Sequence, residues 1–373
     1  MILVLTSVPM KIVNAETLIV EIPFELRGSG VGIMPTAWKS LEFCLVRLED
    51  ELGNTGWGEG FGYFTVDATK AILDRLILPT LIGAAIDDIP AWNLRTQRQI
   101  HMFGRHGISI FAIGGVDIAL WDLAARRAGL PLCRLLSGDA VRETIPFYAS
   151  LIRYADPALV ASACNAAVDA GFQSIKLHET GLAEIAAGRA ALGPDREMCV
   201  DVNCGWSEEF VRQNHDELQK LRLWWLEEPV FPPEDYAALR RLRGRPAPIA
   251  AGENWTTARQ CEEAVAAEAV DIIQPSITKV GGVSEYLKAI DSGSAAGVKV
   301  MPHSPYFGPG LFASLQVAAA RPSVEALEYN FVKPDAWLAD VDGLRTGHRF
   351  AVPQTPGIGF TPDPAVLRRY RRA

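Results

Sequence analysis

Three acidic residues lie at equal intervals near the ends of three short apolar segments. Asp201 lies in MCVDVN, Glu227 in WWLEEP and Glu253 in PIAAGEN, and successive members are 26 positions apart. This interval accommodates one strand, one loop and one helix of a repeating α/β unit. Because parallel strands bring their carboxyl ends to one rim, we expect the three carboxylates to converge there, where their oxygens could bind a hard divalent cation such as Mg²⁺.

The surroundings of these carboxylates also indicate a cation. Each lies in a segment too apolar to bury a negative charge without compensation, which a shared cation would supply. Asn203, two residues beyond Asp201, points to the same strand face and could assist, whereas Glu228 is expected to face outward. We therefore predict Asp201, Glu227 and Glu253 as metal ligands.

The elements that would position these residues alternate between short apolar strands and helices from about residue 131 onward, which indicates a parallel barrel. The predicted fold class is α/β, a modified TIM barrel of the (β/α)7β type over residues 131–334. Residues 335–373 are expected to pack back on the N-terminal domain. Eight candidate strands end near Ser150, His178, Asn203, Glu228, Glu253, Ser276, His303 and Glu328.

Residues 1–130 have a different pattern, which predicts an N-terminal α+β capping domain. Strand-like segments up to about Gly62 form a meander, because turn residues separate them and no helix intervenes. Three helical segments follow, at about Asp67–Leu81, Pro90–Phe103 and Gly107–Ala128.

Composition excludes several classes of protein. Hydrophobic residues make up 49% of the 373 residues and charged residues 21%, which is typical of a globular chain of two domains. A formal net charge of -8 argues against nucleic acid as a partner. Six cysteines without CxxC spacing predict neither zinc nor disulfides and favour the cytoplasm. No apolar run approaches the roughly 20 residues that cross a bilayer, so no membrane association is expected.

These motifs together resemble the enolase superfamily, in the branch of mandelate racemase and muconate lactonizing enzyme, over nearly the whole chain. The resemblance implies Mg²⁺-dependent removal of the proton α to a carboxylate through an enediolate, with acid and base groups at the ends of the second and seventh barrel strands. The motifs are the DxN at Asp201, the LEEP at Glu227, the GEN at Glu253, IQPSITKVGG at Gln274–Gly282 and VDIALWDL at Val116–Leu123.

The second strand departs from the family pattern. SIKLHET places Lys176 and His178 on one strand face, where the family commonly has KxK with the second lysine as base. An imidazole accepts a proton readily near neutral pH, so His178 could take that role. Lys176 is expected against the substrate carboxylate or the metal ligands, and the choice of base between the two residues stays open.

The seventh and eighth strands supply two further residues that the resemblance implies. His303 occupies the other acid/base position, but Ser276 stands where the family usually has an Asp that pairs with this histidine. A hydroxyl orients an imidazole without stabilising imidazolium, so His303 should be the weaker base and the better proton donor. Glu328 matches a family residue that hydrogen-bonds the substrate carboxylate.

The N-terminal domain is expected to cover the site, as it does in the family, with Arg27 and Tyr63 as candidate substrate contacts. The predicted function is dehydration of a sugar acid or related hydroxy acid, a small-molecule carboxylate. A racemase or epimerase of an α-substituted carboxylate is the alternative, and a homologue that binds metal and ligand without turnover is a further one. The resemblance also implies a homo-oligomer.

Overall fold

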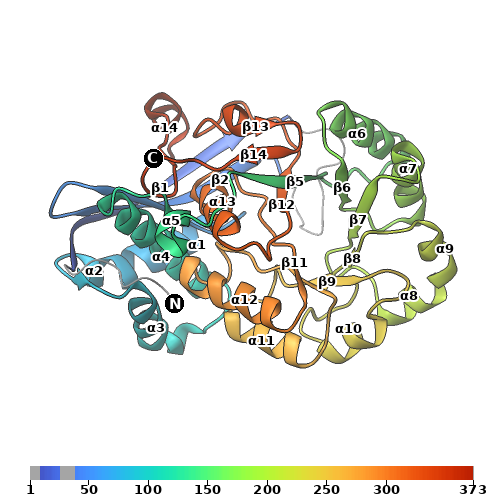
Figure 1. The fold of residues 1–373 in the computed structure, drawn as a ribbon, viewed down its shortest axis with the longest axis horizontal. Coiled ribbons are helices and arrows are strands. Elements are labelled where there is room, and N and C mark those ends of the chain that lie inside the picture. The colour runs from blue at the N-terminus through green and yellow to red at the C-terminus, as the bar shows by residue number, and fades with distance from the viewer. Residues whose placement is uncertain (1–8, 26–37, 373) are drawn as a thin grey trace.

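The computed structural model describes residues 9–25 and 38–372, and it contains two sheets that lie side by side (Figure 1). The first sheet is antiparallel with the order β3-β2-β1-β4. The meander predicted for the start of the chain is therefore present. Its strands are β1 (Met10–Pro23), β2 (Ser40–Asp50), β3 (Thr55–Gly60) and β4 (Ala85–Ile86).

Helices follow this sheet, and together they form what we call the N-terminal unit (β1 to α5). The helix predicted over Asp67–Leu81 is interrupted by a π-helical turn, so that three short helices replace it. The helices are α1 (Val66–Ile72), η1 (Leu73–Ile77), α2 (Leu78–Leu81), α3 (Ile89–Gln99), η2 (His101–Phe103), α4 (Ile108–Arg127) and α5 (Leu132–Ser137).

Helix α4 is the central helix of the N-terminal unit and packs against β3. A Cβ atom on Gly58 would lie 1.9 Å from the Gly115 carbonyl oxygen, so this close approach requires glycine. By length and composition α4 could cross a membrane, contrary to the expectation that no such run exists, but 89% of its apolar window is buried inside the protein. Its apolar character therefore follows from its position in the core.

Eight parallel strands form the barrel, in agreement with the eight candidate strand ends. Successive strands pair in order from β5 to β11, and β12 pairs with β5. The predicted fold class is thus confirmed. The strands are β5 (Thr144–Ser150), β6 (Ser174–Leu177), β7 (Glu197–Asp201), β8 (Leu226–Glu227), β9 (Ile249–Ala251), β10 (Ile272–Ile273), β11 (Lys299–Val300) and β12 (Leu327–Asn330).

Helices surround the barrel and connect its strands (Figure 1). Several begin at a polar residue whose side chain accepts a backbone hydrogen bond, as Asp156, Asp235 and Thr257 do. Such caps satisfy backbone N–H groups that have no partner within the helix. The helices are α6 (Pro157–Asp169), α7 (Leu182–Leu192), α8 (Glu208–Gln213), α9 (His215–Lys220), α10 (Tyr236–Leu242), α11 (Ala258–Ala266), α12 (Val283–Ala295) and α13 (Pro309–Ala320).

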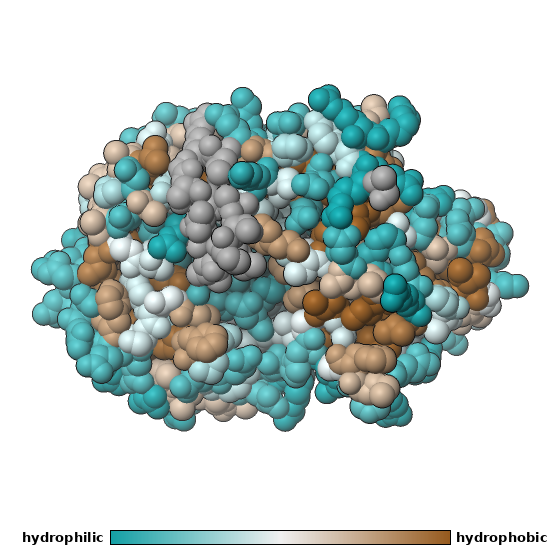
Figure 2. All heavy atoms as spheres, turned by 180° about the vertical axis from the view of Figure 1, so that it is seen from behind, coloured by the Kyte–Doolittle hydropathy of each residue, from teal (hydrophilic) through white to brown (hydrophobic). Residues whose placement is uncertain are grey.

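The C-terminal segment contacts both parts of the protein. Strand β14 pairs antiparallel with β5, and Arg371 forms a bridge with Val20 of β1. The segment therefore lies against the N-terminal sheet as well as the barrel. Its elements are η3 (Asp342–Leu344), β13 (Arg345–Thr346), β14 (Arg349–Ala351) and α14 (Pro364–Tyr370). On the face opposite to Figure 1, hydrophilic residues cover most of the surface between smaller hydrophobic areas (Figure 2).

Buried carboxylates connect the N-terminal unit to the barrel through helix N-termini. Glu59 of β3 accepts a hydrogen bond from the Gly310 N–H in the first turn of α13, at 2.9 Å. Asp117 of α4 accepts one from the Ser284 N–H in the first turn of α12, at 3.0 Å. Burial is the largest influence on both carboxyl groups and raises the pKa of each to about 7.

Candidate active site

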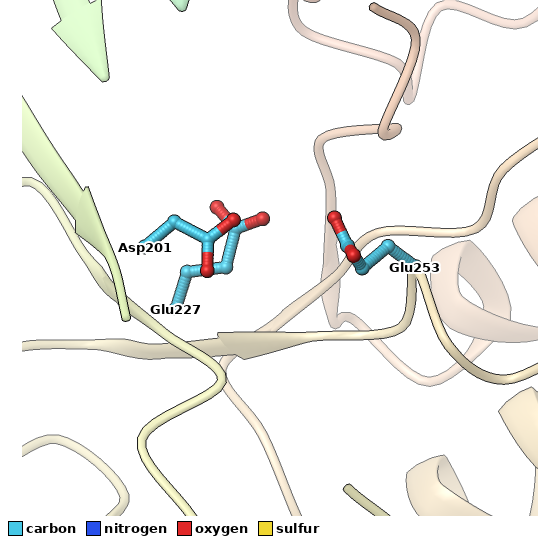
Figure 3. Close-up of side chains that lie close together, drawn as sticks. All are labelled: Asp201, Glu227 and Glu253. Carbon is cyan, nitrogen blue, oxygen red and sulfur yellow. The ribbon is translucent and has the colours of Figure 1, made fainter. Parts of the chain in front are cut away.

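The three predicted metal ligands converge at the carboxyl ends of adjacent barrel strands. Asp201 ends β7, Glu227 ends β8, and Glu253 lies two residues beyond β9. One carboxylate oxygen from each lies within 4.8 Å of the others. Figure 3 shows Asp201 and Glu227 together, with Glu253 facing them across a gap. We call these three residues the carboxylate trio.

Strand register and one glycine explain this convergence. Asp201 and Glu227 are direct partners in the parallel pair β7–β8, so their side chains lie next to each other. Gly252, just before Glu253, has a φ of 141°, and a Cβ there would lie 2.8 Å from the Gln274 backbone nitrogen. The backbone can turn Glu253 toward the other two acids because this position has no side chain.

Lys176 lies directly against the trio. Its Nζ atom is 2.6 Å from Glu227 Oε1, 3.0 Å from Asp201 Oδ2 and 3.2 Å from Glu328 Oε1, and its side chain is fully buried. Burial alone would lower the pKa of Lys176, but the Asp201 and Glu227 charges outweigh it and raise the pKa well above the usual value. Lys176 therefore stays positively charged.

The charge balance of the site fits a divalent cation. One buried ammonium faces three buried carboxylates, and Glu253 adds a fourth negative group beside them. Burial, and after it the Asp201 charge, raises the pKa of Glu227. Within residues 9–25 and 38–372, Asp201 Oδ2 is buried without a partner in hydrogen-bond geometry, although Lys176 Nζ is 3.0 Å away. Oxygen ligands with excess negative charge are the donor set that Mg²⁺ prefers, so the residues present fit this ion.

His178 lies at the Asp201 end of the trio. Its Nδ1 atom is 2.6 Å from the Leu151 carbonyl oxygen, and its Nε2 atom is 3.4 Å from Asp201 Oδ2. A carbonyl oxygen only accepts, so Nδ1 carries a hydrogen, and in the neutral ring the lone pair lies on Nε2, the atom that faces Asp201. Burial would lower the pKa of His178, but the Asp201 carboxylate raises it overall, an influence that a cation on Asp201 would weaken.

His303 lies at the other end, with its Nε2 atom 3.1 Å from Glu253 Oε2. Its Nδ1 atom is 3.1 Å from Ser276 Oγ, so the serine occupies the orienting position that the sequence suggested. The Tyr306 hydroxyl also lies 3.3 Å from Nδ1 and hydrogen-bonds to Ser276. Burial is the largest influence on His303 and lowers its pKa. Tyr306 was not among the residues predicted from the sequence.

Glu328 and Asn203 also lie at the site. Glu328 lies within the last barrel strand, β12, as a buried carboxylate whose charge Lys176 balances, and neither of its oxygens has a partner in hydrogen-bond geometry among the described residues. It can therefore accept a hydrogen bond from a ligand. Asn203 donates its backbone N–H to Asp201 Oδ1 at 2.8 Å, so its backbone orients a trio member.

The two candidate substrate contacts from the N-terminal domain have different outcomes. Arg27 lies outside the described residues. The Tyr63 hydroxyl donates a hydrogen bond to the Pro305 carbonyl oxygen at 2.9 Å, which anchors it to the loop between His303 and Tyr306. A role of Tyr63 in substrate contact stays a prediction.

Glu228 does not face away from the site, contrary to expectation. Its backbone φ of 44° breaks the alternation of the strand, and its oxygens lie 3.0 and 2.9 Å from Asn254 Nδ2. The same amide nitrogen is 3.3 Å from Glu253 Oε1, and Lys279 Nζ is 2.9 Å from Asn254 Oδ1. Asn254 thus contacts Glu253 directly, and Glu228 and Lys279 hold the Asn254 amide in place. In the sequence, Glu228 and Asn254 stand next to the motif acids, and Lys279 lies within the IQPSITKVGG motif.

Comparisons with known proteins agree with this geometry. Residues 15–137 match the profile of the mandelate racemase / muconate lactonizing enzyme N-terminal domain, and residues 158–366 match that of the enolase C-terminal domain-like family. Arabinonate dehydratase of Saccharolobus solfataricus is 28% identical over 89% of this chain and 91% of that protein. D-galactarolactone cycloisomerase of Agrobacterium fabrum is 29% identical over 88% and 90%.

A solved structure also matches this chain in its fold. The crystal structure of a racemase from Streptomyces coelicolor A3(2) with bound magnesium superposes with a TM-score of 0.83 at 25% identity, covering 97% of this chain and all of that one. The barrel with its rim of acids defines an enolase-type protein. The chain belongs to the mandelate racemase / muconate lactonizing enzyme branch of the enolase superfamily.

Proposed function

We propose that this protein is a Mg²⁺-dependent enzyme that removes the proton α to the carboxylate of a small hydroxy acid and then eliminates the β hydroxyl group. The observation that carries the proposal is a carboxylate trio with one histidine at each end. Relatives named as a dehydratase, a cycloisomerase and a racemase support chemistry at the α carbon of sugar acids and similar substrates.

The trio would hold the cation, with Asp201, Glu227 and Glu253 as its ligands. When bound, Mg²⁺ supplies positive charge that stabilises the negative charge developing on the substrate carboxylate. Lys176 adds a fixed ammonium at the same position, because its contacts with three carboxylates hold it there. These contacts support an electrostatic role for Lys176 and not that of the base.

His178 is then the base. Its Nδ1–H bond to the Leu151 carbonyl leaves the Nε2 lone pair to accept the α proton, and its side chain stays partly exposed at the barrel mouth. His303, in its imidazolium form, gives a proton from Nε2 to the departing hydroxyl group, which leaves as water, and His303 becomes neutral. One proton is thus taken by His178 and one is returned by His303. Glu328, whose charge Lys176 balances, would accept a hydrogen bond from a substrate hydroxyl or carboxyl group.

A racemase or epimerase is the second candidate, because histidines at opposite ends of the trio could exchange a proton on both faces of the α carbon.

Cytoplasmic location and a homo-oligomeric assembly stay predictions for this chain. Large hydrophobic side chains that could support self-association include Met102 and Phe231, which are 77% and 76% exposed.

Incubation of the protein with Mg²⁺ and a library of sugar acids in D₂O tests both candidates. Dehydration yields a keto acid that has lost one water, detected by mass spectrometry and as a carbonyl adduct. Deuterium at the α carbon without loss of water would instead identify the racemase. His178→Ala should lower kcat by roughly 10²- to 10⁴-fold. His215→Ala, which removes a partly exposed histidine on α9, is the matched control.

A further inference from the structure

Gln274 carries a buried amide that the rest of the protein does not pair. It follows β10 at the carboxyl end of the barrel, and its side chain is fully buried. Neither its Oε1 nor its Nε2 atom has a hydrogen-bond partner within residues 9–25 and 38–372. Such an amide costs stability, because both atoms lose the hydrogen bonds that water makes to them in the unfolded chain. Proteins retain costs of this kind mainly at functional sites.

Two other glutamines are buried in the described part of the chain, and both are paired. Gln316 Oε1 accepts the Cys133 N–H at 2.9 Å, and its Nε2 donates to the Pro353 carbonyl oxygen at 2.8 Å. Gln97 likewise has a partner for each of its two amide atoms. These two amides hold parts of the fold together, whereas the amide of Gln274 makes no such bond.

Alternation along β10 directs Gln274 into the barrel. Ile272 packs inside the barrel with residues from β5, β7 and β9. Ile273 faces helix α12 on the outside, where a Cβ atom on Gly293 would lie 2.3 Å from its Cδ1 atom. The Gln274 N–H continues the parallel pairing by donating to the Ala251 carbonyl oxygen at 3.0 Å. Because side chains alternate along a strand, Gln274 faces inward as Ile272 does.

The residues beside Gln274 on the neighbouring strands offer its amide little. Continued by one residue, the register of β10 places Gly252 on one side and Met301 on the other. Glycine has no side chain, and a thioether is at most a weak acceptor. The amide is therefore left to the centre of the barrel mouth, where Lys176 and Glu227 are equally buried. Full burial is thus common to the polar groups that line this site.

A hydroxyl group is the chemical complement of this amide. Nε2 donates hydrogen bonds and Oε1 accepts them, and a hydroxyl group can accept one and donate one at the same time. A carboxylate could accept from Nε2 but would leave Oε1 unpaired. The chemistry of the side chain therefore favours an alcohol over the carboxylate that the cation is expected to bind.

We propose that Gln274 is a substrate-binding residue whose amide holds one hydroxyl group of the acid, so that the site selects polyhydroxy acids. The inference rests on the proposed function and deepens it, because it names a substrate group that is recognised in addition to the carboxylate. A site built to bond a hydroxyl group rejects the analogue that lacks it, since the buried amide then stays unpaired.

The first test needs no substrate. Gln274→Met removes the amide but keeps a side chain of similar length, and it should raise the Tm of the ligand-free protein because an unpaired buried amide is gone. Gln316→Met is the matched control and should lower the Tm, because it leaves the Cys133 N–H and the Pro353 carbonyl without their partner. Gln274→Leu is measured in parallel. If neither variant at position 274 raises the Tm, the amide is satisfied without a ligand and the inference is refuted.

The second test measures which hydroxyl group the amide holds. His178→Ala protein with Mg²⁺ should bind the acid selected from the library without consuming it, so calorimetry can compare this acid with analogues that each lack one hydroxyl group. One analogue should bind about 10- to 100-fold more weakly than the acid. Adding Gln274→Met should remove this difference and leave the differences for the other hydroxyl groups unchanged.

The outcomes separate this inference from the proposed function. If each analogue loses the same affinity with and without Gln274→Met, the amide holds no hydroxyl group and the inference is overturned, although turnover of the acid would still support the proposed function. If no acid in the library reacts, the proposed function fails, while the Tm comparison of Gln274→Met with Gln316→Met still decides whether the buried amide lacks a partner.

Discussion

Glu59→Gln should make the stability of the protein less sensitive to a rise in pH from acidic to neutral values. Glu59 is buried at the contact between β3 and the start of α13, where it accepts the Gly310 N–H, and burial raises its pKa from 4.5 to about 7. A carboxyl group whose pKa is raised on folding stabilises the protein below its unfolded-state pKa, and this contribution is lost as pH rises through the folded-state pKa. The relevant window is therefore between pH 4.5 and about pH 7.

The magnitude follows from the shift in pKa. A rise from 4.5 to about 7 corresponds to about 3 kcal/mol of unfolding free energy that the wild-type protein loses between pH 4 and pH 8. Glutamine keeps an oxygen that can accept the Gly310 N–H but does not ionise. The pH-dependent loss of stability should thus be smaller in the variant by about this amount, whatever offset the amide nitrogen introduces at all pH values.

Urea denaturation at half-unit steps from pH 4.5 to pH 8 measures this difference. Asp139→Asn, which replaces an almost fully exposed carboxylate, is the control and should follow the wild-type curve. If Glu59→Gln and the wild-type protein lose stability in parallel over this range, Glu59 does not titrate as its burial requires. The reasoning about the buried contact between the N-terminal unit and the barrel would then be refuted.

Three further perturbations test the metal site and the packing. Glu227→Gln should weaken Mg²⁺ binding in calorimetry by about tenfold or more, while Glu268→Gln at an exposed ion pair should not change it; equal affinities would exclude Glu227 as a ligand. Mg²⁺ at 100 times its Kd should stabilise the wild-type protein by about 2.7 kcal/mol, an effect that chelation reverses, and an unchanged Tm would count against the site. Gly58→Ala should destabilise the protein by at least about 1–3 kcal/mol, because its Cβ meets the rigid Gly115 carbonyl. Gly193→Ala, where space is open but φ is 73°, should cost only about 1 kcal/mol by denaturation, and equal costs would show that β3 and α4 can separate.

The sequence predicted those parts of the site that depend on periodicity. Asp201, Glu227 and Glu253 follow apolar strands at a regular interval, and parallel strands have no other way to arrange their ends than along one rim. Lys176 likewise follows from alternation along β6, which directs it toward the trio. These predictions were possible because they depend only on the regular geometry of strands.

The residues that the sequence analysis missed depend on irregular backbone. Glu228 faces the site because of a positive φ that a glutamate rarely adopts, and no residue pattern announces it. Tyr306 lies in the loop beyond β11, where neither strand nor helix periodicity fixes the direction of a side chain. Its contact with Ser276 joins residues 30 positions apart. Only the structure shows that the loop after β10 and the loop after β11 bring them together.

The N-terminal unit bonds directly to the loop that carries the proposed acid. Glu59 accepts the Gly310 N–H and Tyr63 donates to the Pro305 carbonyl, so residues 303–310 are fastened at two points to a different part of the chain. A chimera that joined this barrel to the N-terminal half of a relative would loosen His303 unless matching partners came with it. Substitutions in the N-terminal unit that change substrate preference are therefore expected to affect the position of His303 as well. Substrate preference and reaction outcome should then change together during evolution.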